Sequence, residues 1–325
     1  MKRVFSGVQP TNNLHIGNYL GAIKNWIDLQ KEYECIFCVV DLHALTVYQK
    51  PEALRENILN VVKTYVALGI DPNRSIIFQQ SDVKEHAELA WVLNTITKTS
   101  ELERMTQFKD KAKAHKENVN MGLFDYPVLM VADIVLYDTD LVPVGKDQEQ
   151  HLELTRVVTR RFNSLYGDTF TIPEPLIKKE GALILALDDP SKKMSKSASS
   201  VNNYISLLDE PEVAKKKIMR AVTDSGTEVT SGGDKPALTN LLTIYSLLSG
   251  LSIKEVEKQY AGQGYGDFKK GLAEVVENFL QEFQNKFNKI SDKEAKEILA
   301  TGANKAQKLA TKKMEEVKKI IGIQI

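Results

Sequence analysis

The chain has 325 residues, of which 42% are hydrophobic and 26% charged, a composition typical of a globular protein that buries a sizeable core. Its 43 basic and 43 acidic residues cancel, so any nucleic-acid-binding surface has to be local. No apolar run approaches the ~20 residues that a membrane-spanning helix needs, and the first residues lack the pattern of a signal peptide. We therefore expect a cytoplasmic protein that does not enter a membrane.

Strand and helix signals alternate along the first half of the chain. Short apolar strands are predicted at 3–8, 35–40, 75–78 and 141–144, and helices at 16–30, 51–68, 86–96, 127–137 and 147–165. Repeated β-α units with apolar strands predict a doubly wound, Rossmann-like parallel sheet with helices on both faces.

Helical patterns dominate the second half, at 212–222, 238–248, 253–261, 268–290 and 293–320. We predict an α/β domain over residues 1–195 and an α-helical domain over residues 196–325. The last helix of the second domain can pack back on the first domain.

The two cysteines, Cys35 and Cys38, form a C-x-x-C pattern within a predicted strand. A zinc or redox site requires the two sulfur atoms to converge, and zinc requires further ligands. Residues i and i+3 of a strand point to opposite faces. We therefore interpret both as buried core thiols, as free cysteines commonly are.

A loop that begins at Gly7 and reaches Asn18 joins the first strand to the first helix. Neither common glycine-rich phosphate loop is present in the chain. Open α/β sheets nevertheless bind ligands at the carboxyl ends of their strands, and a helix N-terminus attracts phosphate. Because Gly17 has no Cβ, a flat adenine could pack on its backbone. The same glycine and asparagine could instead serve only the geometry of a βα connection.

Two short motifs, His15-Ile16-Gly17-Asn18 and Lys193-Met194-Ser195-Lys196-Ser197, stand in this order about 180 residues apart. Together with Gly7-Val8-Gln9-Pro10, Tyr126-Pro127, Leu129-Met130-Val131-Ala132-Asp133 and Val142-Pro143-Val144-Gly145-Lys146-Asp147-Gln148, they resemble the signatures of the bacterial tryptophanyl-tRNA synthetases, a class I aminoacyl-tRNA synthetase family. The resemblance covers essentially the whole chain. Asn18 stands where the general class I signature has a second histidine, so contacts with adenine would run through an amide.

The resemblance implies that L-tryptophan reacts with ATP, assisted by Mg²⁺, and is then transferred to tRNA(Trp) by a homodimer whose helical domain binds the anticodon. Lys193, Lys196 and Lys111 would be the catalytic cations that stabilise negative charge on the phosphates. No residue is assigned as a metal ligand. The implied ATP-binding residues are Gln9, Pro10, Thr11, Gly17, Asn18, Gly145, Lys146, Asp147, Ile184, Lys193, Met194, Ser195, Lys196 and Ser197.

Asp133 lies in an otherwise apolar predicted helix, where a carboxylate is costly unless it has a partner. It could form a structural salt bridge. The resemblance instead implies that it accepts a hydrogen bond from the indole N–H of tryptophan. The implied tryptophan-binding residues are Asp133, Phe5, Gly7, Tyr126, Met130, Val142, Val144 and Gln148.

Three alternatives remain open on the sequence. A tyrosyl-tRNA synthetase shares the fold and the signatures, and a small nucleotidylyltransferase shares an H-x-G-H loop but lacks the lysine motif and the helical domain. A non-catalytic relative that binds tRNA or an amino acid is the third. Asp41 and His43 follow a strand without further metal ligands, and we interpret them as positioning groups near the nucleotide.

Overall fold

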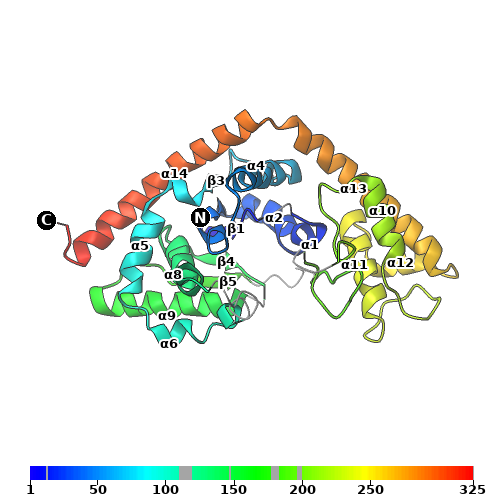
Figure 1. The fold of residues 1–325 in the computed structure, drawn as a ribbon, viewed down its shortest axis with the longest axis horizontal. Helices are drawn as coiled ribbons and strands as arrows, with labels where there is room; N and C mark the ends of the chain where they lie inside the picture. The colour runs from blue at the N-terminus through cyan, green and yellow to red at the C-terminus, as the bar shows by residue number, and fades with distance from the viewer. Residues whose placement is uncertain (12–13, 110–118, 146–147, 177–182, 196–199, 325) are drawn as a thin grey trace.

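The computed structural model describes residues 1–11, 14–109, 119–145, 148–176, 183–195 and 200–324 (Figure 1). Its centre is a five-stranded parallel sheet with the strand order β3-β2-β1-β4-β5. The strands are β1 (Arg3–Val8), β2 (Glu34–Val39), β3 (Ile76–Gln79), β4 (Leu141–Pro143) and β5 (Glu174–Leu176). The predicted parallel α/β sheet is confirmed. The fifth strand was not predicted, because a three-residue segment of Glu, Pro and Leu carries no apolar pattern.

The first helical region is continuous but changes its hydrogen-bonding pattern. The predicted helix at 16–30 consists of α1 (Ile16–Asn18), the π-helical turn η1 (Tyr19–Ile23) and α2 (Lys24–Glu32). Such π turns are often found at functional sites, and this one directly follows the first signature motif.

The helix that carries Asp133, α8 (Met121–Val135), begins six residues earlier than predicted. The side-chain oxygen of Asn120 accepts the backbone N–H of Leu123 at 2.9 Å and so caps the helix. Pro127, the predicted first residue, therefore lies inside the helix. The asparagine cap, rather than the proline, determines where this helix begins.

The other helices of the first half are α3 (Asp41–Ala44), α4 (Pro51–Leu68), the 3₁₀ turn η2 (Gln80–Asp82), α5 (Glu85–Asn94), α6 (Thr99–Leu102) and α9 (Glu149–Tyr166). These helices cover both faces of the sheet, and a separate apolar core lies on each face. Cys35 and Cys38 are buried and unbonded, and they belong to the cores on opposite faces, as predicted. Burial raises the pKa of the Cys35 thiol to about 12, so this thiol is unreactive at neutral pH.

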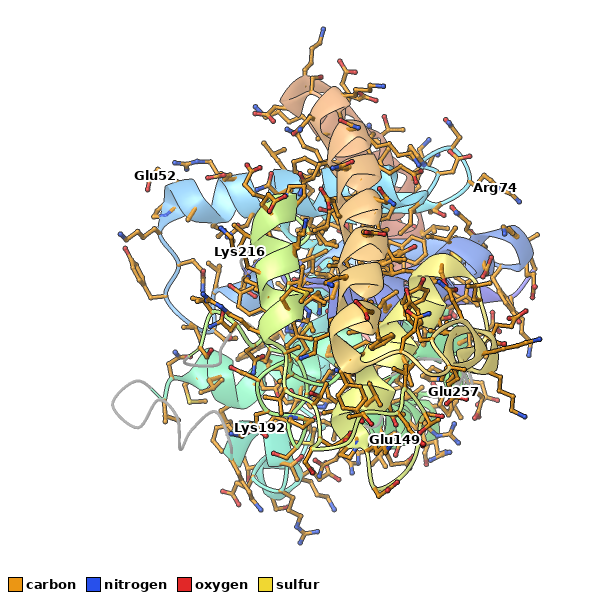
Figure 2. All side chains as sticks on the ribbon, turned by 90° about the vertical axis from the view of Figure 1, so that its right-hand side faces the viewer. Glu52, Arg74, Glu149, Lys192, Lys216 and Glu257 are labelled. Atoms are coloured by element: carbon orange, nitrogen blue, oxygen red, sulfur yellow. The ribbon has the colours of Figure 1, made fainter. Side chains whose placement is uncertain are left out.

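The helical half contains α10 (Pro211–Arg220), α11 (Pro236–Ser249), α12 (Ile253–Gln259) and α13 (Tyr265–Lys289). Its helices share an apolar core, and α10 lies beside α13 (Figure 2). Ile184, Leu187 and Met194 pack in this same core, together with Ile16 and Leu20 of the first half. The domain boundary at residue 195 stays a prediction, and the segment before it contacts both halves.

No single helix in the described part of the chain is long and apolar enough to cross a membrane. Helices α11 and α12 reach that length and composition only as a pair, and they are bent by 104° relative to each other.

The last helix, α14 (Asp292–Ile320), leaves the helical half and returns along the sheet, so that α13 and α14 form an arch (Figure 1). It packs on β3, which is an edge strand of the sheet. Gly302 faces the backbone of Ile77 so closely that a Cβ would collide with the Ile77 carbonyl oxygen. Ala306 and Ala310 continue the contact into the core. Small residues thus allow α14 to cover a strand edge that would otherwise be open to pairing with other chains.

We expect Gly302→Ala to lower the stability of the protein by about 1–3 kcal/mol, because the added methyl group has to push α14 away from β3. The measurement is the melting temperature together with urea unfolding. Gly266→Ala in α13 is the matched control, since its Cβ would meet no atom within 4 Å. Equal effects of the two substitutions would contradict the close helix–strand contact.

Candidate active site

Two adjoining cavities open at the carboxyl ends of β1 and β4. We name them the Asp133 cavity, of about 480 Å³, and the Gly17 cavity, of about 580 Å³. Ser6, Gly7, Pro143 and Gln148 line both, so the two are compartments of one cleft. The strands are added outward from β1 to β3 on one side of the sheet and from β4 to β5 on the other. The winding therefore reverses between β1 and β4, which is the position where open α/β sheets bind ligands.

The Gly17 cavity brings the two signature motifs together. A Cβ on Gly17 would lie 3.0 Å from His15 Nδ1 and 3.2 Å from Met194 Sδ, so any side chain here would push against both motifs. Of the residues expected to bind ATP, six line this cavity: Gly17, Asn18, Gly145, Ile184, Lys193 and Met194. The side-chain oxygen of Asn18 accepts the backbone N–H of His15 at 3.0 Å, which leaves its NH₂ group as the donor. That orientation suits an amide that donates to a base.

The segment that carries Lys193 is held in place by residues of the helical half. The backbones of Lys193 and Leu185 form an isolated antiparallel β-bridge. The backbone N–H of Met194 donates to the carbonyl oxygen of Ile184 at 2.9 Å. The side chain of Asn240 in α11 bonds both the N–H and the carbonyl of Leu185, at 2.8 and 3.0 Å. The helical half therefore positions this segment at the cleft.

The backbone of Ser195 is held in the same way, because its N–H donates to Asn203 Oδ1 at 3.0 Å.

The other residues expected to bind ATP lie elsewhere. Gln9 lines the Asp133 cavity instead of the Gly17 cavity. Pro10 and Thr11 are not among the described residues that line either cavity. The remaining expected residues lie outside the described part of the chain: Lys111, Lys146, Asp147, Lys196 and Ser197.

The Asp133 cavity contains every residue expected to bind tryptophan: Phe5, Gly7, Tyr126, Met130, Asp133, Val142, Val144 and Gln148. Apolar side chains form most of the wall, and a few polar groups converge on it. This combination is typical of a pocket that encloses a flat apolar ligand and orients it through its polar atoms.

Asp133 is 1% exposed and accepts hydrogen bonds from three side chains. His43 Nε2 lies 2.7 Å from Oδ2, while Gln80 Nε2 and His86 Nδ1 each lie 2.6 Å from Oδ1. Burial alone would raise the pKa of this carboxyl, but the charge and hydrogen bonds of His43 and His86 outweigh it and hold the pKa well below its usual range. Asp133 is therefore ionised at neutral pH.

The two interpretations of Asp133 are thus compatible with each other. The carboxylate has partners within the protein, as a structural role requires, and it also lines the cavity, as a substrate contact requires. A carboxylate offers about four acceptor positions, and the described residues occupy three of them.

Tyr126 lies at the same cavity with its hydroxyl 2.9 Å from His151 Nε2. Burial raises the pKa of Tyr126 to about 12, so its phenol stays protonated at neutral pH and can hydrogen-bond without charge. Gln107 also lines the cavity, with its side-chain oxygen 3.5 Å from the Tyr126 hydroxyl.

Several side chains at the site were not predicted from the sequence, or were given another place. His43, interpreted as a positioning group near the nucleotide, bonds Asp133 and lines the Asp133 cavity. It therefore positions this carboxylate, and its relation to the nucleotide stays a prediction. Gln80, His86 and Gln107 were not predicted. A signal existed for His43 and Gln80, since each follows the carboxyl end of a parallel strand.

The described residues contain no group of three or more His, Cys, Asp or Glu side chains that could hold a metal ion. What the cleft offers instead is a buried anion in an apolar cavity, beside a second compartment formed by the two signature motifs. This arrangement suits binding and orientation of two substrates.

Comparison with known proteins supports this description. A family described as class I tRNA synthetases for W and Y, that is, tryptophan and tyrosine, matches residues 1–281. A tryptophan–tRNA ligase of Caldanaerobacter subterraneus subsp. tengcongensis is 53% identical over 324 residues, which cover 99% of each chain.

Solved structures show the same similarity. A tryptophanyl-tRNA synthetase from Mycoplasma pneumoniae has a TM-score of 0.92 and 36% identity, with 99% of this chain and 98% of that chain covered. The enzyme from Campylobacter jejuni, solved in complex with ADP and tryptophan, has a TM-score of 0.84 and 40% identity, with coverage of 98% and 99%. The sheet, the two signature motifs in one cleft and these similarities together show that the chain belongs to the class I aminoacyl-tRNA synthetases, in the family of the tryptophan and tyrosine enzymes.

Proposed function

We propose that the protein is a tryptophan–tRNA ligase. In the first step a carboxylate oxygen of L-tryptophan attacks the α-phosphorus of ATP, and pyrophosphate leaves with the electron pair of the broken P–O bond. In the second step the 3′-terminal ribose hydroxyl of tRNA(Trp) attacks the acyl carbon of tryptophanyl-adenylate. This hydroxyl loses its proton, and AMP leaves.

The observation that carries the proposal is the ionised carboxylate of Asp133 in a cavity whose wall is mainly apolar. An indole ring matches both properties, because it is flat and apolar and has a single N–H donor. Tyr126 and Gln148 line the same cavity, and we propose that they hold the ammonium group of the substrate. Phe5, Gly7, Met130, Val142 and Val144 then form the walls around the ring. The C. jejuni enzyme, 40% identical, was solved with tryptophan bound, which supports this choice of ligand.

For ATP, we propose the Gly17 cavity, with adenine against the Gly17 backbone and Asn18 as a donor to the base. Gly145 and Asp147 would hold the ribose hydroxyls. Lys193 and Lys196, with Lys111, would stabilise the charge that develops on the phosphates in the transition state. The ADP bound to the C. jejuni enzyme supports a nucleotide in this family of clefts.

We propose that Mg²⁺ enters with ATP as part of the substrate. Mg²⁺ keeps several waters and commonly binds through substrate phosphates rather than in an all-protein cage. The described residues include no cluster that would form such a cage. We therefore propose that phosphate oxygens and waters are the ligands of this Mg²⁺.

Amino-acid-dependent exchange of pyrophosphate into ATP tests the function directly. Tryptophan, tyrosine and phenylalanine are to be compared at equal concentrations, and charging of tRNA(Trp) is measured in parallel. The proposal requires exchange with tryptophan far above the other two. Preference for tyrosine would favour the tyrosyl alternative, and binding of tryptophan without exchange would indicate a non-catalytic relative.

We expect Lys193→Ala to slow adenylate formation by about 10²–10³-fold with a smaller change in the tryptophan Kd, since the cation acts mainly in the transition state. Pre-steady-state kinetics measures this rate. Lys192→Ala is the control, because Lys192 is adjacent to Lys193 but its side chain lies at the surface (Figure 2). This side chain is 72% exposed and forms an ion pair with Asp189. Equal rates for the two variants would exclude a catalytic role of Lys193.

For Asp133→Asn we expect a loss of discrimination with only moderate loss of stability. The amide oxygen can still accept from Gln80 and His86, and the NH₂ group then faces the indole N–H. Sites built to hydrogen-bond a substrate reject an analogue without the donor by roughly 10⁴-fold or more. The measurement is the ratio of kcat/KM for tryptophan to that for 3-(3-benzothienyl)alanine, in which sulfur replaces the N–H. An unchanged ratio would exclude Asp133 from recognition of the ring.

We propose that the helical half, residues 196–325 in the predicted division, binds the anticodon region of tRNA(Trp). This half has its own apolar core, and its helix α11 holds the segment that carries Lys193. Binding of tRNA to this half could therefore affect the position of Lys193 at the cleft.

We also propose a cytoplasmic location, since aminoacyl-tRNA is consumed there in translation.

A homodimer is our further proposal. Trp91 in α5 is 73% exposed, and Tyr48 and Met121 are also largely exposed. The segment around Thr46 is joined to the start of α8 by Asn120, and α8 packs against α5. These large apolar side chains thus lie on adjoining elements, and closed two-fold dimers are the commonest oligomers.

We expect wild-type protein to be a dimer in light scattering at micromolar concentration and Trp91→Glu to shift it towards monomer, because a charge in an apolar interface is not compensated. Val213→Glu is the control, at an exposed apolar residue of α10 in the helical half. A monomeric wild type, or equal effects of both substitutions, would contradict this interface.

A further inference from the structure

The carboxylate of Asp133 is held from behind by two donors on its Oδ1 atom. Gln80 Nε2 and His86 Nδ1 both lie 2.6 Å from this oxygen. The other oxygen, Oδ2, contacts His43 Nε2 at 2.7 Å. Both acceptor positions of Oδ1 are thus occupied, and among the described residues only Oδ2 keeps a position for another donor.

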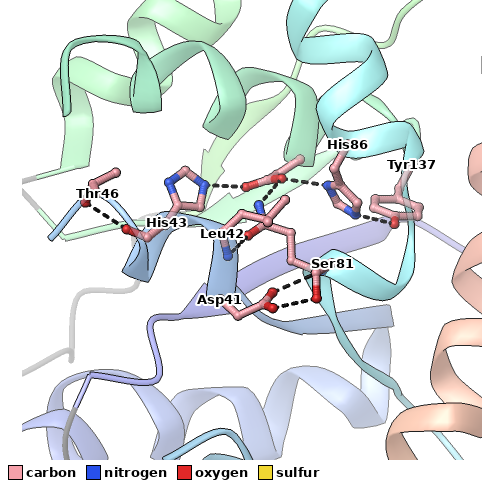
Figure 3. A network of polar contacts seen from close by, with 9 residues as sticks. Asp41, Leu42, His43, Thr46, Ser81, His86 and Tyr137 are labelled. Carbon is pink, nitrogen blue, oxygen red and sulfur yellow. Dashed lines mark hydrogen bonds and ion pairs between the residues drawn. The ribbon is translucent and has the colours of Figure 1, made fainter. Parts of the chain in front are cut away.

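The direction of each donor is determined by a contact on its far side. Gln80 Oε1 accepts the backbone N–H of Leu42 at 3.1 Å, so that its NH₂ group has to face Asp133. His86 Nε2 lies 2.7 Å from the hydroxyl of Tyr137 (Figure 3). An ionised carboxylate can only accept hydrogen bonds, so His86 donates to Asp133 through Nδ1. Its other ring nitrogen, Nε2, is held by the hydroxyl of Tyr137.

Aromatic packing keeps these rings from moving. His86 and Tyr137 are fully or almost fully buried, with exposed fractions of 0% and 1%. His86 stacks on Phe78 with ring centroids 5.7 Å apart, and Tyr137 stacks on Phe5 at 5.8 Å. Phe5 lines the Asp133 cavity itself. The chain of contacts from Tyr137 through His86 to Asp133 is therefore rigid and adjoins the cavity wall.

We propose that His86, oriented by Tyr137, is a positioning residue for substrate recognition: it holds Oδ1 of Asp133 so that Oδ2 faces the ring N–H of the substrate. This inference rests on the proposed function, because it requires Asp133 to accept that hydrogen bond. His86 is not among the described residues that line the Asp133 cavity. Its effect is to fix the rotation of the carboxylate, on which the direction of the remaining acceptor position depends.

Two substitutions at His86 separate positioning from packing. The amide of asparagine can place a nitrogen near the position of Nδ1, so His86→Asn keeps the donor to Asp133 and loses the contact with Tyr137. The longer glutamine amide reaches the position of Nε2, so His86→Gln keeps a partner for Tyr137 and loses the donor to Asp133. Each variant therefore retains one half of the contact that histidine makes.

The measured quantity is the ratio of kcat/KM for tryptophan to that for 3-(3-benzothienyl)alanine, with the KM for ATP and the melting temperature measured in parallel. We expect His86→Gln to lower the ratio about 10-fold or more, the usual effect of losing one hydrogen bond to a charged group. We expect His86→Asn to lower the ratio by only about 3-fold, because it keeps the donor to Asp133 but loses the Tyr137 contact that orients this donor. The KM for ATP should change little in both variants.

An unchanged ratio in His86→Gln, or equal losses in both variants, would overturn the proposal and leave His86 as a packing residue. If His86→Gln does not fold, Tyr137→Phe decides, since it removes only the hydroxyl that orients His86, and a wild-type ratio would then overturn the proposal. A wild-type protein without tryptophan-dependent exchange would instead refute the proposed function, which separates the two failures.

Discussion

A negative charge buried in an apolar core has to be compensated by donors from the surrounding structure, and the charge of Asp133 places this requirement on four separate elements. Asp133 itself comes from α8, and its three donors come from α3, η2 and α5. Removing one donor from such a buried network leaves the negative charge without full compensation. The four elements therefore have to keep one arrangement. The same carboxylate lines a cavity, and the packing that satisfies it thereby also determines the shape of the candidate binding site.

The second constraint concerns the two signature motifs, which no local interaction could bring together. The backbone N–H of Ile16 donates to the carbonyl oxygen of Ile205 at 2.9 Å. The backbones of His15 and Ser206 form an isolated antiparallel β-bridge. Met194 then packs against Gly17. The Gly17 cavity is therefore formed between the sheet and the helical half, and Asn240 of the helical half orients one of its walls. The hydrogen bonds of Asn240 to Leu185, which pairs with Lys193, connect the helical half to the Lys193 segment.

The arch of α13 and α14 connects these two constraints (Figure 1). Helix α13 belongs to the core of the helical half, while α14 packs on β3 and near α5, which supplies His86. The side chains of Gln307 and Thr311 in α14 both contact Glu85 at the start of α5. The carboxyl-terminal helix thus links the helical half physically to the element that supports Asp133.

The sequence by itself determined the local elements, because they depend on local periodicity. The strands at Arg3–Val8 and Glu34–Val39 and the helices α4, α5, α9 and α10 to α14 lie within a few residues of their predicted positions. It also identified eight of the residues that line the Asp133 cavity, and all of these but Phe5 lie in short motifs that resemble a known family. Start points set by side-chain caps, such as Asn120, were less well predicted, because one hydrogen bond outweighs the pattern.

Tertiary structure alone decided which residues complete the site. His43, Gln80 and His86 lie 90, 53 and 47 residues from Asp133 in the chain, and no motif links them to it. Their partnership arises because parallel strands end at one edge of the sheet and because a buried charge selects whichever donors the packing places there. The close contact of Gly302 with the backbone of Ile77 was likewise not predictable from the sequence. The reason for a glycine within a helix becomes clear only when the strand that packs against it is known.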